Sequence, residues 1–288
     1  TVTAQANGLV WLNEVNSSMN VLTVASATAN VILSAAQSIV DWANTDAVDV
    51  TSPTGLQITA RAGSIGNSGY LEVNTGSSGL VRSNATGNIR LKELSDDMKV
   101  ALISSTGGVV DLVADGSIVD GLQNSEVDVN GALGISLRAS NGFIGDSGYL
   151  EIVSGTNSPV FAQAKGVVAL STTVGDLRID SITSQTAAVN LVSAGGIIDH
   201  NNSAAADIVA ATGVWLTATN GGSIGDIDNL EIETSDGAPV NATAPGNVRL
   251  RELTNDMAVQ RVQSSQGMVY LQSARSIVDA LNTDAVDV

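Results

Sequence analysis

Aspartate residues recur at fixed positions along the chain, and a row of carboxylates is able to bind a cation. One set of aspartates ends a short apolar motif, Ser-Ile-Val-Asp or a close variant, and consists of Asp41, Asp120, Asp199 and Asp279. A second set follows eight residues later and consists of Asp49, Asp128, Asp207 and Asp287. If successive coils of the chain stack, carboxylates at such corners lie about 5 Å apart, and backbone carbonyls complete the oxygen shell that calcium prefers.

A related corner, Phe-Ile-Gly-Asp or Ser-Ile-Gly-Asp, adds two more aspartates to this row. The candidate calcium ligands are therefore Asp41, Asp120, Asp146, Asp199, Asp226 and Asp279. The alternative interpretation is that these side chains cap the N–H groups of turns while facing water, as aspartate commonly does. No Gly-Gly-x-Gly-x-Asp run, the strongest calcium signature of a β-helix, occurs in the sequence. Both interpretations stay open at this point.

Residues suited to catalysis are few. The chain has no cysteine and one histidine, which excludes thiol catalysis and cysteine-based zinc sites. That histidine, His200, stands where the other copies of the motif have Trp42, Gly121 and Ala280. Every recurrent acid repeats along the chain, whereas an enzyme site would interrupt the repeat once. We therefore predict no catalytic residues and no enzymatic activity, with calcium as the one cofactor to consider.

Three tryptophans could stack on sugar rings. Trp11 and Trp215 lie inside apolar runs that read as strands, so we expect both to fill the core. Trp42 follows a turn aspartate, and we expect it to be exposed.

The aspartate motif belongs to a long internal repeat of 79 to 80 residues. A Leu-Glu-Val/Ile motif recurs at residues 71–73, 150–152 and 230–232, and an Ile-Gly corner recurs at Gly66, Gly145 and Gly225. A Gly-Asn-Ile-Arg-Leu motif at residues 87–91 returns at 246–250, with weaker copies at 8–12 and 166–170. The shared period of these motifs predicts one continuous array with repeat phases near 1–50, 51–129, 130–208 and 209–288.

Each repeat divides into short segments in which apolar and polar residues alternate. Residues 88–91, 109–112 and 134–137 show this pattern, which is typical of half-buried strands, and glycine-rich corners separate them. Short strands and corners predict an all-β parallel β-helix (β-solenoid) with three coils per repeat and about eleven coils in the chain. Ile118 and Ile224 should point inward. An array of β-sandwich domains is the alternative, but eight aromatic residues would fill such cores poorly.

Composition excludes several classes of protein. Twelve Lys and Arg against 29 Asp and Glu give a net charge of −17, which excludes the basic stripe of a nucleic-acid binder. No apolar run approaches the roughly 18 residues of a membrane-spanning helix, so we expect no membrane insertion. Hydrophobic residues make up 43% of the chain, which is enough to form a core.

Residues 109–120, 134–146, 214–226 and 269–279 carry a strand-then-corner pattern that resembles the repeats of very large bacterial surface proteins, the filamentous-haemagglutinin-like exoproteins. The resemblance implies a right-handed β-helix used as an extracellular surface fibre, matrix component or adhesin stalk. A solenoid cut within its array exposes unpaired N–H and C=O groups at each end, so we expect further copies of the chain, end to end or in a longer filament, as partners. Cell-surface glycans and other fibres are further partners to consider. The alternative function is a β-helix that binds or degrades polysaccharide.

Overall fold

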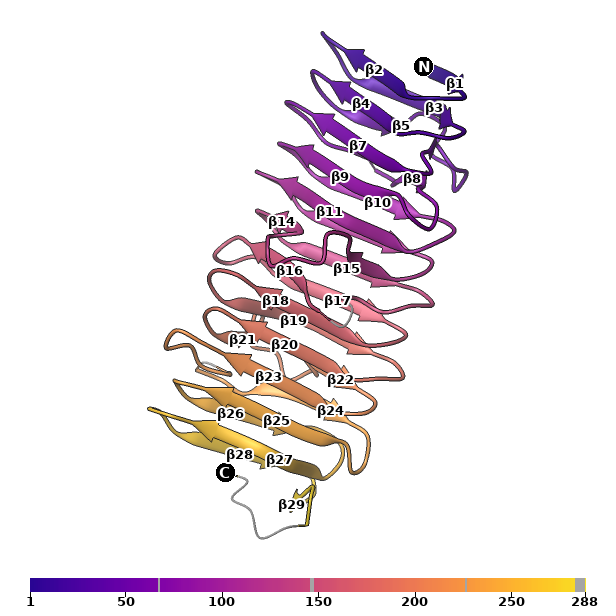
Figure 1. The fold of residues 1–288 in the computed structure, drawn as a ribbon. Coiled ribbons are helices and arrows are strands. Elements are labelled where there is room, and N and C mark those ends of the chain that lie inside the picture. The colour runs from indigo at the N-terminus through magenta and orange to yellow at the C-terminus, as the bar shows by residue number, and fades with distance from the viewer. Residues whose placement is uncertain (67, 146–147, 226, 283–287) are drawn as a thin grey trace. The chain divides into compact units, whose positions relative to one another are not determined.

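The computed structural model describes residues 1–66, 68–145, 148–225, 227–282 and 288. These residues form strands, turns and bends and contain no helix, and the strands pair in parallel. The predicted parallel β-solenoid is therefore confirmed, with about 13 turns in all, where the sequence suggested eleven. The chain divides into two compact units, residues 1–143 and 144–288. Within each unit the strands of successive coils lie side by side in layers (Figure 1).

The first unit has two parallel sheets. One sheet runs in the order β1 (Val2–Ala6), β3 (Met19–Ser26), β6 (Val50–Thr51), β8 (Leu71–Asn74), β10 (Ile89–Glu93), β12 (Val110–Ala114) and β15 (Ile135–Ala139), with β5 (Ile39–Asp41) paired to β3. The other runs in the order β2 (Val10–Glu14), β4 (Val31–Ala35), β7 (Gly55–Ala60), β9 (Leu80–Ala85), β11 (Met98–Ser105) and β14 (Val129–Gly131), with β13 (Ile118–Asp120) paired to β11.

The second unit is built in the same way. One sheet runs in the order β17 (Val160–Ala164), β19 (Leu177–Ser184), β22 (Ile208–Ala210), β24 (Leu230–Thr234), β26 (Val248–Glu252) and β28 (Val269–Ser273), with β21 (Ile197–Asp199) paired to β19. The other runs in the order β16 (Leu150–Ser154), β18 (Val168–Thr172), β20 (Val189–Ser193), β23 (Val214–Ala218), β25 (Pro239–Ala244), β27 (Met257–Ser264) and β29 (Ile277–Asp279).

One sequence repeat spans three and a half turns rather than the three expected. Strand pairing leads from Val10 through Val31 and Leu56 to Val81, which makes three turns, and β10 begins half a turn later at Ile89. In the second unit the pairing leads from Val168 through Val189 and Val214 to Val240, and β26 begins half a turn later. Copies of one motif therefore alternate between the two sheets within each unit, as β2 and β10 do, and as β18 and β26 do.

The core consists of the inward residues of each strand, stacked on their equivalents in the neighbouring coils. In β10 and β12, for example, Ile89 and Leu91 pair with Val110 and Leu112, and all four are fully buried. This stacking lets small aliphatic side chains exclude water without large aromatics. Ile118 and Ile224 are also fully buried, which confirms the prediction that they point inward.

The three Ile-Gly corners adopt a backbone conformation that favours glycine. Gly66, Gly145 and Gly225 have φ values of 67°, 72° and 65°. A Cβ atom at Gly66 would stand 2.8 Å from the carbonyl oxygen of Arg90 on the next coil. The positive φ and this close approach together explain why the position is glycine in each copy.

Candidate functional site

Two acidic triads, one in each unit, form the candidate site. In the first unit Asp41, Asp49 and Glu72 each offer a carboxylate oxygen, and these oxygens all lie within 4.8 Å of one another. In the second unit Asp199, Asp207 and Glu231 are arranged in the same way. Asp41 is half-buried and the other five residues are buried.

Strand pairing between successive coils builds each triad. In the first unit Val50 pairs with Val73, so Asp49 and Glu72, which precede them, stand side by side. Two hydrogen bonds join them: the Asp49 N–H donates to the Glu72 carbonyl at 2.9 Å, and the Glu72 N–H donates to the Asp49 side chain at Oδ2, at 3.1 Å. Asp41 ends β5, and the loop that follows it returns the chain to Asp49.

The second triad repeats these contacts. The Asp207 N–H donates to the Glu231 carbonyl at 2.9 Å, and the Glu231 N–H donates to Asp207 Oδ2 at 2.8 Å. Asp199 ends β21, as Asp41 ends β5. The same hydrogen bonds therefore build one triad in each unit.

The first acid of each triad also caps the turn that follows it. Asp41 accepts hydrogen bonds from the N–H groups of Ala43 and Thr45 at 2.8 and 2.9 Å, and Asp199 accepts one from Asn201 at 2.9 Å. Turn capping and triad membership thus coexist at these residues. The two interpretations that the sequence left open do not exclude each other.

Burial makes ionisation of the triads costly. The pKa of Asp49 and that of Asp207 are each raised to about 8, first because burial removes water from the carboxylate and further because neighbouring carboxylates repel its charge. The N–H groups that donate to these two side chains oppose the shift. Burial also raises the pKa values of Glu72 and Glu231.

Several triad oxygens are buried without a hydrogen-bond donor. Among the described residues, nothing donates to Glu72 Oε2, Asp199 Oδ2 or Glu231 Oε2. Two basic side chains lie nearby. Lys92 contacts Asp46 at 2.7 Å, and the partly exposed Arg251 is 3.9 Å from Glu231 Oε1. The triads thus keep acceptor oxygens that this part of the chain does not satisfy.

Of the remaining candidate calcium ligands, Asp120 and Asp279 lie among the described residues. Asp120 caps its own turn, accepting from the N–H groups of Leu122 and Asn124 at 2.7 and 2.8 Å. Asp279 is exposed at the end of β29 and accepts from Leu281 and Asn282. Asp146 and Asp226 lie outside the described residues.

The two glutamates of the triads were not among the ligands expected from the sequence. Glu72 and Glu231 belong to the first and third copies of the Leu-Glu-Val/Ile motif, and Glu151 belongs to the second. Asp49 and Asp207 belong to the second aspartate set. The common period of these motifs was the available signal. The missing information was which coils are neighbours, because Asp49 and Glu72 are separated by one full turn.

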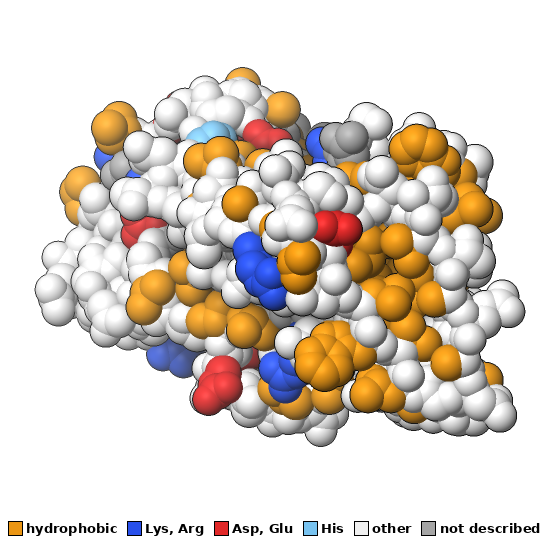
Figure 2. Space-filling view, turned by 90° about the horizontal axis from the view of Figure 1, so that it is seen from above, with side chains coloured by type: hydrophobic (Ala, Val, Ile, Leu, Met, Phe, Trp, Pro, Cys, Tyr) orange, Lys and Arg blue, Asp and Glu red, His pale blue; other side chains and the backbone are white. Residues whose placement is uncertain are grey.

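Tryptophan placement is partly as expected. Trp42 is 57% exposed, as expected, and lines a shallow pocket with Asp41, Asn44 and Tyr70. The expectation that Trp11 and Trp215 fill the core is wrong, because they are 72% and 36% exposed. Strand alternation turns Val214 and Leu216 inward and so places Trp215 on the outer face. Exposed apolar side chains also form patches on the face in Figure 2.

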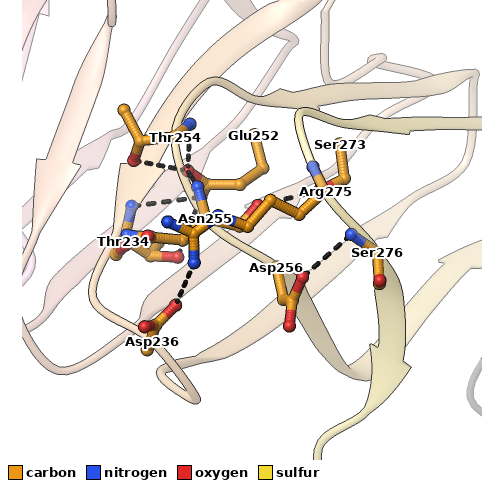
Figure 3. Close-up of polar contacts among 9 residues, drawn as sticks. All are labelled: Thr234, Asp236, Glu252, Thr254, Asn255, Asp256, Ser273, Arg275 and Ser276. Carbon is orange, nitrogen blue, oxygen red and sulfur yellow. Dashed lines mark hydrogen bonds and ion pairs between the residues drawn. The ribbon is translucent and has the colours of Figure 1, made fainter.

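A different buried glutamate, Glu252, holds a turn closed. Its Oε2 accepts from the N–H and hydroxyl of Thr234 at 3.0 and 2.8 Å, while its Oε1 accepts from the N–H groups of Thr254 and Asn255 at 3.1 and 3.3 Å. Figure 3 shows this carboxylate between two turns of neighbouring coils. Because both oxygens have donors, the network around Glu252 is structural and leaves no acceptor for a ligand.

Comparison of the chain with protein-family models, with curated proteins and with solved structures yields no match. The part of the chain that the structure describes contains no helix able to cross a membrane. Function is therefore inferred from the fold and from the chemistry of the two triads.

Proposed function

We propose that this protein is structural: an extracellular bacterial surface or matrix fibre, or an adhesin stalk, built from β-solenoid repeats. The observation that supports this best is the uninterrupted repetition within each unit, where every coil pairs with the coils before and after it. In such a stack each coil depends only on its neighbours, so length is added by adding coils. Repetition of the acids, in place of one unique constellation, favours a structural role over catalysis.

Composition supports the same role. A net charge of −17 favours solubility and discourages unspecific association, and the absence of cysteine removes dependence on disulfide formation. The resemblance of the repeats to those of bacterial exoproteins supports a position outside the cell. Fold alone does not determine function, so location is the property to test.

The test is surface labelling of the source organism with antibodies raised against the purified chain. Intact cells, and the same cells after permeabilisation, are compared by immunogold electron microscopy. We expect strong labelling of intact cells or of material between them. Labelling that requires permeabilisation would contradict the proposal.

Polysaccharide binding is the second candidate function, and the pocket beside Trp42 favours it. The exposed Trp42 ring and the Tyr70 ring line this pocket together with the polar side chains of Asn20 and Asn44. The Tyr70 hydroxyl donates to Asp111 at 2.8 Å, which fixes the tyrosine ring. An aromatic wall beside amide groups is suited to stacking and hydrogen bonding with a sugar.

Affinity electrophoresis in gels containing soluble polysaccharides tests this second function. Trp42→Ala should remove any retardation of the chain, whereas Trp215→Ala, which removes another outward-facing tryptophan, should keep it. Equal retardation of both variants would place binding elsewhere, and no retardation of the parent chain would reject this function for the polysaccharides tested.

A further inference from the structure

We infer that each of the two acidic triads that lie within a single unit, Asp41–Asp49–Glu72 and Asp199–Asp207–Glu231, is a binding site for one calcium ion. This assigns calcium to three acids drawn from neighbouring coils. The row of corner aspartates that the sequence suggested shares Asp41 and Asp199 with these triads but contains none of the other four acids. The inference does not depend on the location or biological role of the protein.

The spacing of the carboxylates suits a shared ion. Calcium binds oxygen at about 2.3–2.6 Å, so two ligands of one ion stand at most about 5 Å apart. The oxygens of each triad lie within 4.8 Å of one another. One ion can therefore contact all three side chains without a change in the strand pairing that positions them.

Buried oxygens without donors point to a ligand that is not yet accounted for. Glu231 and Asp199 are 2% and 4% exposed, and their oxygens Oε2 and Oδ2 accept no hydrogen bond from the described residues. Asp199 offers an oxygen within 4.8 Å of one on Asp207, and in the first unit Glu72 does the same toward Asp49. Buried polar atoms are normally satisfied, so an unsatisfied oxygen on a carboxyl group grouped with two others indicates a cation among them.

Charge leads to the same conclusion. Three adjacent carboxylates repel one another strongly when buried, and a cation or a shared proton must offset that repulsion. Lys92 already contacts Asp46, and Arg251 approaches only Glu231 Oε1. Neither basic side chain reaches the oxygens that lack donors.

The donor set selects the kind of cation. Each triad offers carboxylate oxygen alone, which favours hard cations such as calcium and magnesium over zinc or copper. Magnesium demands near-octahedral geometry and keeps several waters, whereas calcium accepts irregular shells of six to eight oxygens. Magnesium is usually held by one or two carboxylates, so a group of three carboxylates fits calcium better.

Direct measurement of bound calcium tests the inference on the 288-residue chain. Chelator-treated protein is dialysed against calcium, and bound metal is measured by elemental analysis for the parent, Asp49→Asn, Asp207→Asn and the double variant. Asparagine keeps an acceptor for the N–H of the neighbouring glutamate but removes the charge. We expect each single variant to bind one calcium fewer than the parent and the double variant two fewer. Asp115→Asn, which changes an exposed aspartate of the first unit, should bind as much as the parent.

Two measurements on the parent chain test the inference even where the variants fold poorly. Terbium replaces calcium in oxygen sites, and Trp42, next to Asp41, should sensitise terbium emission that calcium then displaces. In the parent chain calcium should raise the melting temperature, and magnesium at the same concentration should raise it less. Absence of bound calcium and of a calcium-dependent melting shift in the parent would overturn the inference. So would unchanged calcium binding in a folded double variant, which would instead indicate that the acids share a proton.

Discussion

At the scale of the residue, the buried carboxyl groups of this fold differ in how many of their oxygens accept hydrogen bonds. Glu252 receives donors on both oxygens, whereas the triad acids retain oxygens without donors. Glu93 is intermediate: its Oε2 accepts from the N–H and hydroxyl of Thr75 at 3.0 and 2.7 Å. In the third copy of the sequence repeat the equivalent residue is Thr172, whose hydroxyl forms hydrogen bonds with the Ser193 hydroxyl and the Gly175 carbonyl instead. The position thus tolerates a neutral side chain that can still form hydrogen bonds.

Glu93 should therefore make stability depend on pH. Burial raises its pKa above the ordinary value of 4.5, so the folded chain binds this proton more tightly than the unfolded chain. The contribution of Glu93 to the free energy of unfolding is then greatest at low pH and is lost as pH rises through the raised pKa. We expect the difference in stability between the parent and Glu93→Gln to shift in favour of Gln between pH 5 and pH 7.5, measured by urea unfolding. Parallel pH profiles for the two proteins would contradict this.

A charge introduced at a buried apolar position should lower the free energy of unfolding much more than a change at Glu93. Ile118 is fully buried, so Ile118→Asp places a carboxylate where no partner exists and should cost more than about 3 kcal/mol. Ile118→Val keeps the position apolar and should cost about 0.5–1.5 kcal/mol. Thermal and urea unfolding of both variants provide the measurement. A melting temperature of Ile118→Asp within error of the parent would show that the side chain does not face the core.

At the scale of the element, corners decide how strands of neighbouring coils meet. At Gly66 the chain turns with positive φ directly beneath Arg90 of the next coil. Its N–H donates to the Ile39 carbonyl at 2.9 Å, and the preceding Ile65 bridges both Ile39 and Ile89. This corner therefore links three successive coils, and a side chain there would disturb all of them.

Alanine variants of two glycines can distinguish the free-energy cost of a positive φ from the cost of a Cβ clash. Gly66 and Gly76 have φ values of 67° and 61°, but a Cβ at Gly76 would meet no atom nearer than 3.8 Å. Alanine at either position should cost about 1–2 kcal/mol for the left-handed backbone. Gly66→Ala should cost at least about 1 kcal/mol more, because its Cβ also clashes with the backbone. Equal destabilisation of the two variants, measured by urea unfolding, would show that the contact at Gly66 is unimportant.

At the scale of the whole molecule, the half-turn in each repeat sets the periodicity. Because three and a half turns make one repeat within each unit, successive copies of a motif fall on opposite sheets. A repeat of three whole turns would have placed every copy on one face.

Fibres of this protein should show that periodicity. With about 4.8 Å between coils, one sequence repeat advances about 17 Å and the same face recurs after about 34 Å. A three-coil repeat would give about 14–15 Å instead. Fibre diffraction or helical reconstruction from electron micrographs of the native protein measures these spacings directly. A 14–15 Å axial repeat would contradict the half-turn arrangement.

The sequence by itself determined the fold class, the repeat and many core positions of this protein. Alternation of apolar and polar residues is a local property of strands, so inward residues such as Ile118 and Ile224 could be predicted without knowing which strands pair. Corner glycines could likewise be predicted, because backbone conformation is set within a few residues.

Tertiary structure alone decided which coils meet, because turn length varies from coil to coil and the motif period does not reveal it. The count of three and a half turns follows from strand pairing between Val10, Val31, Leu56 and Val81. The orientation of Trp215 follows from its register with the buried Val214 and Leu216, since hydrophobicity alone suggested the core. The triads required both kinds of information: the acids recur in the sequence, but only pairing of neighbouring coils brings Glu72 beside Asp49, because side-chain proximity between coils depends on register.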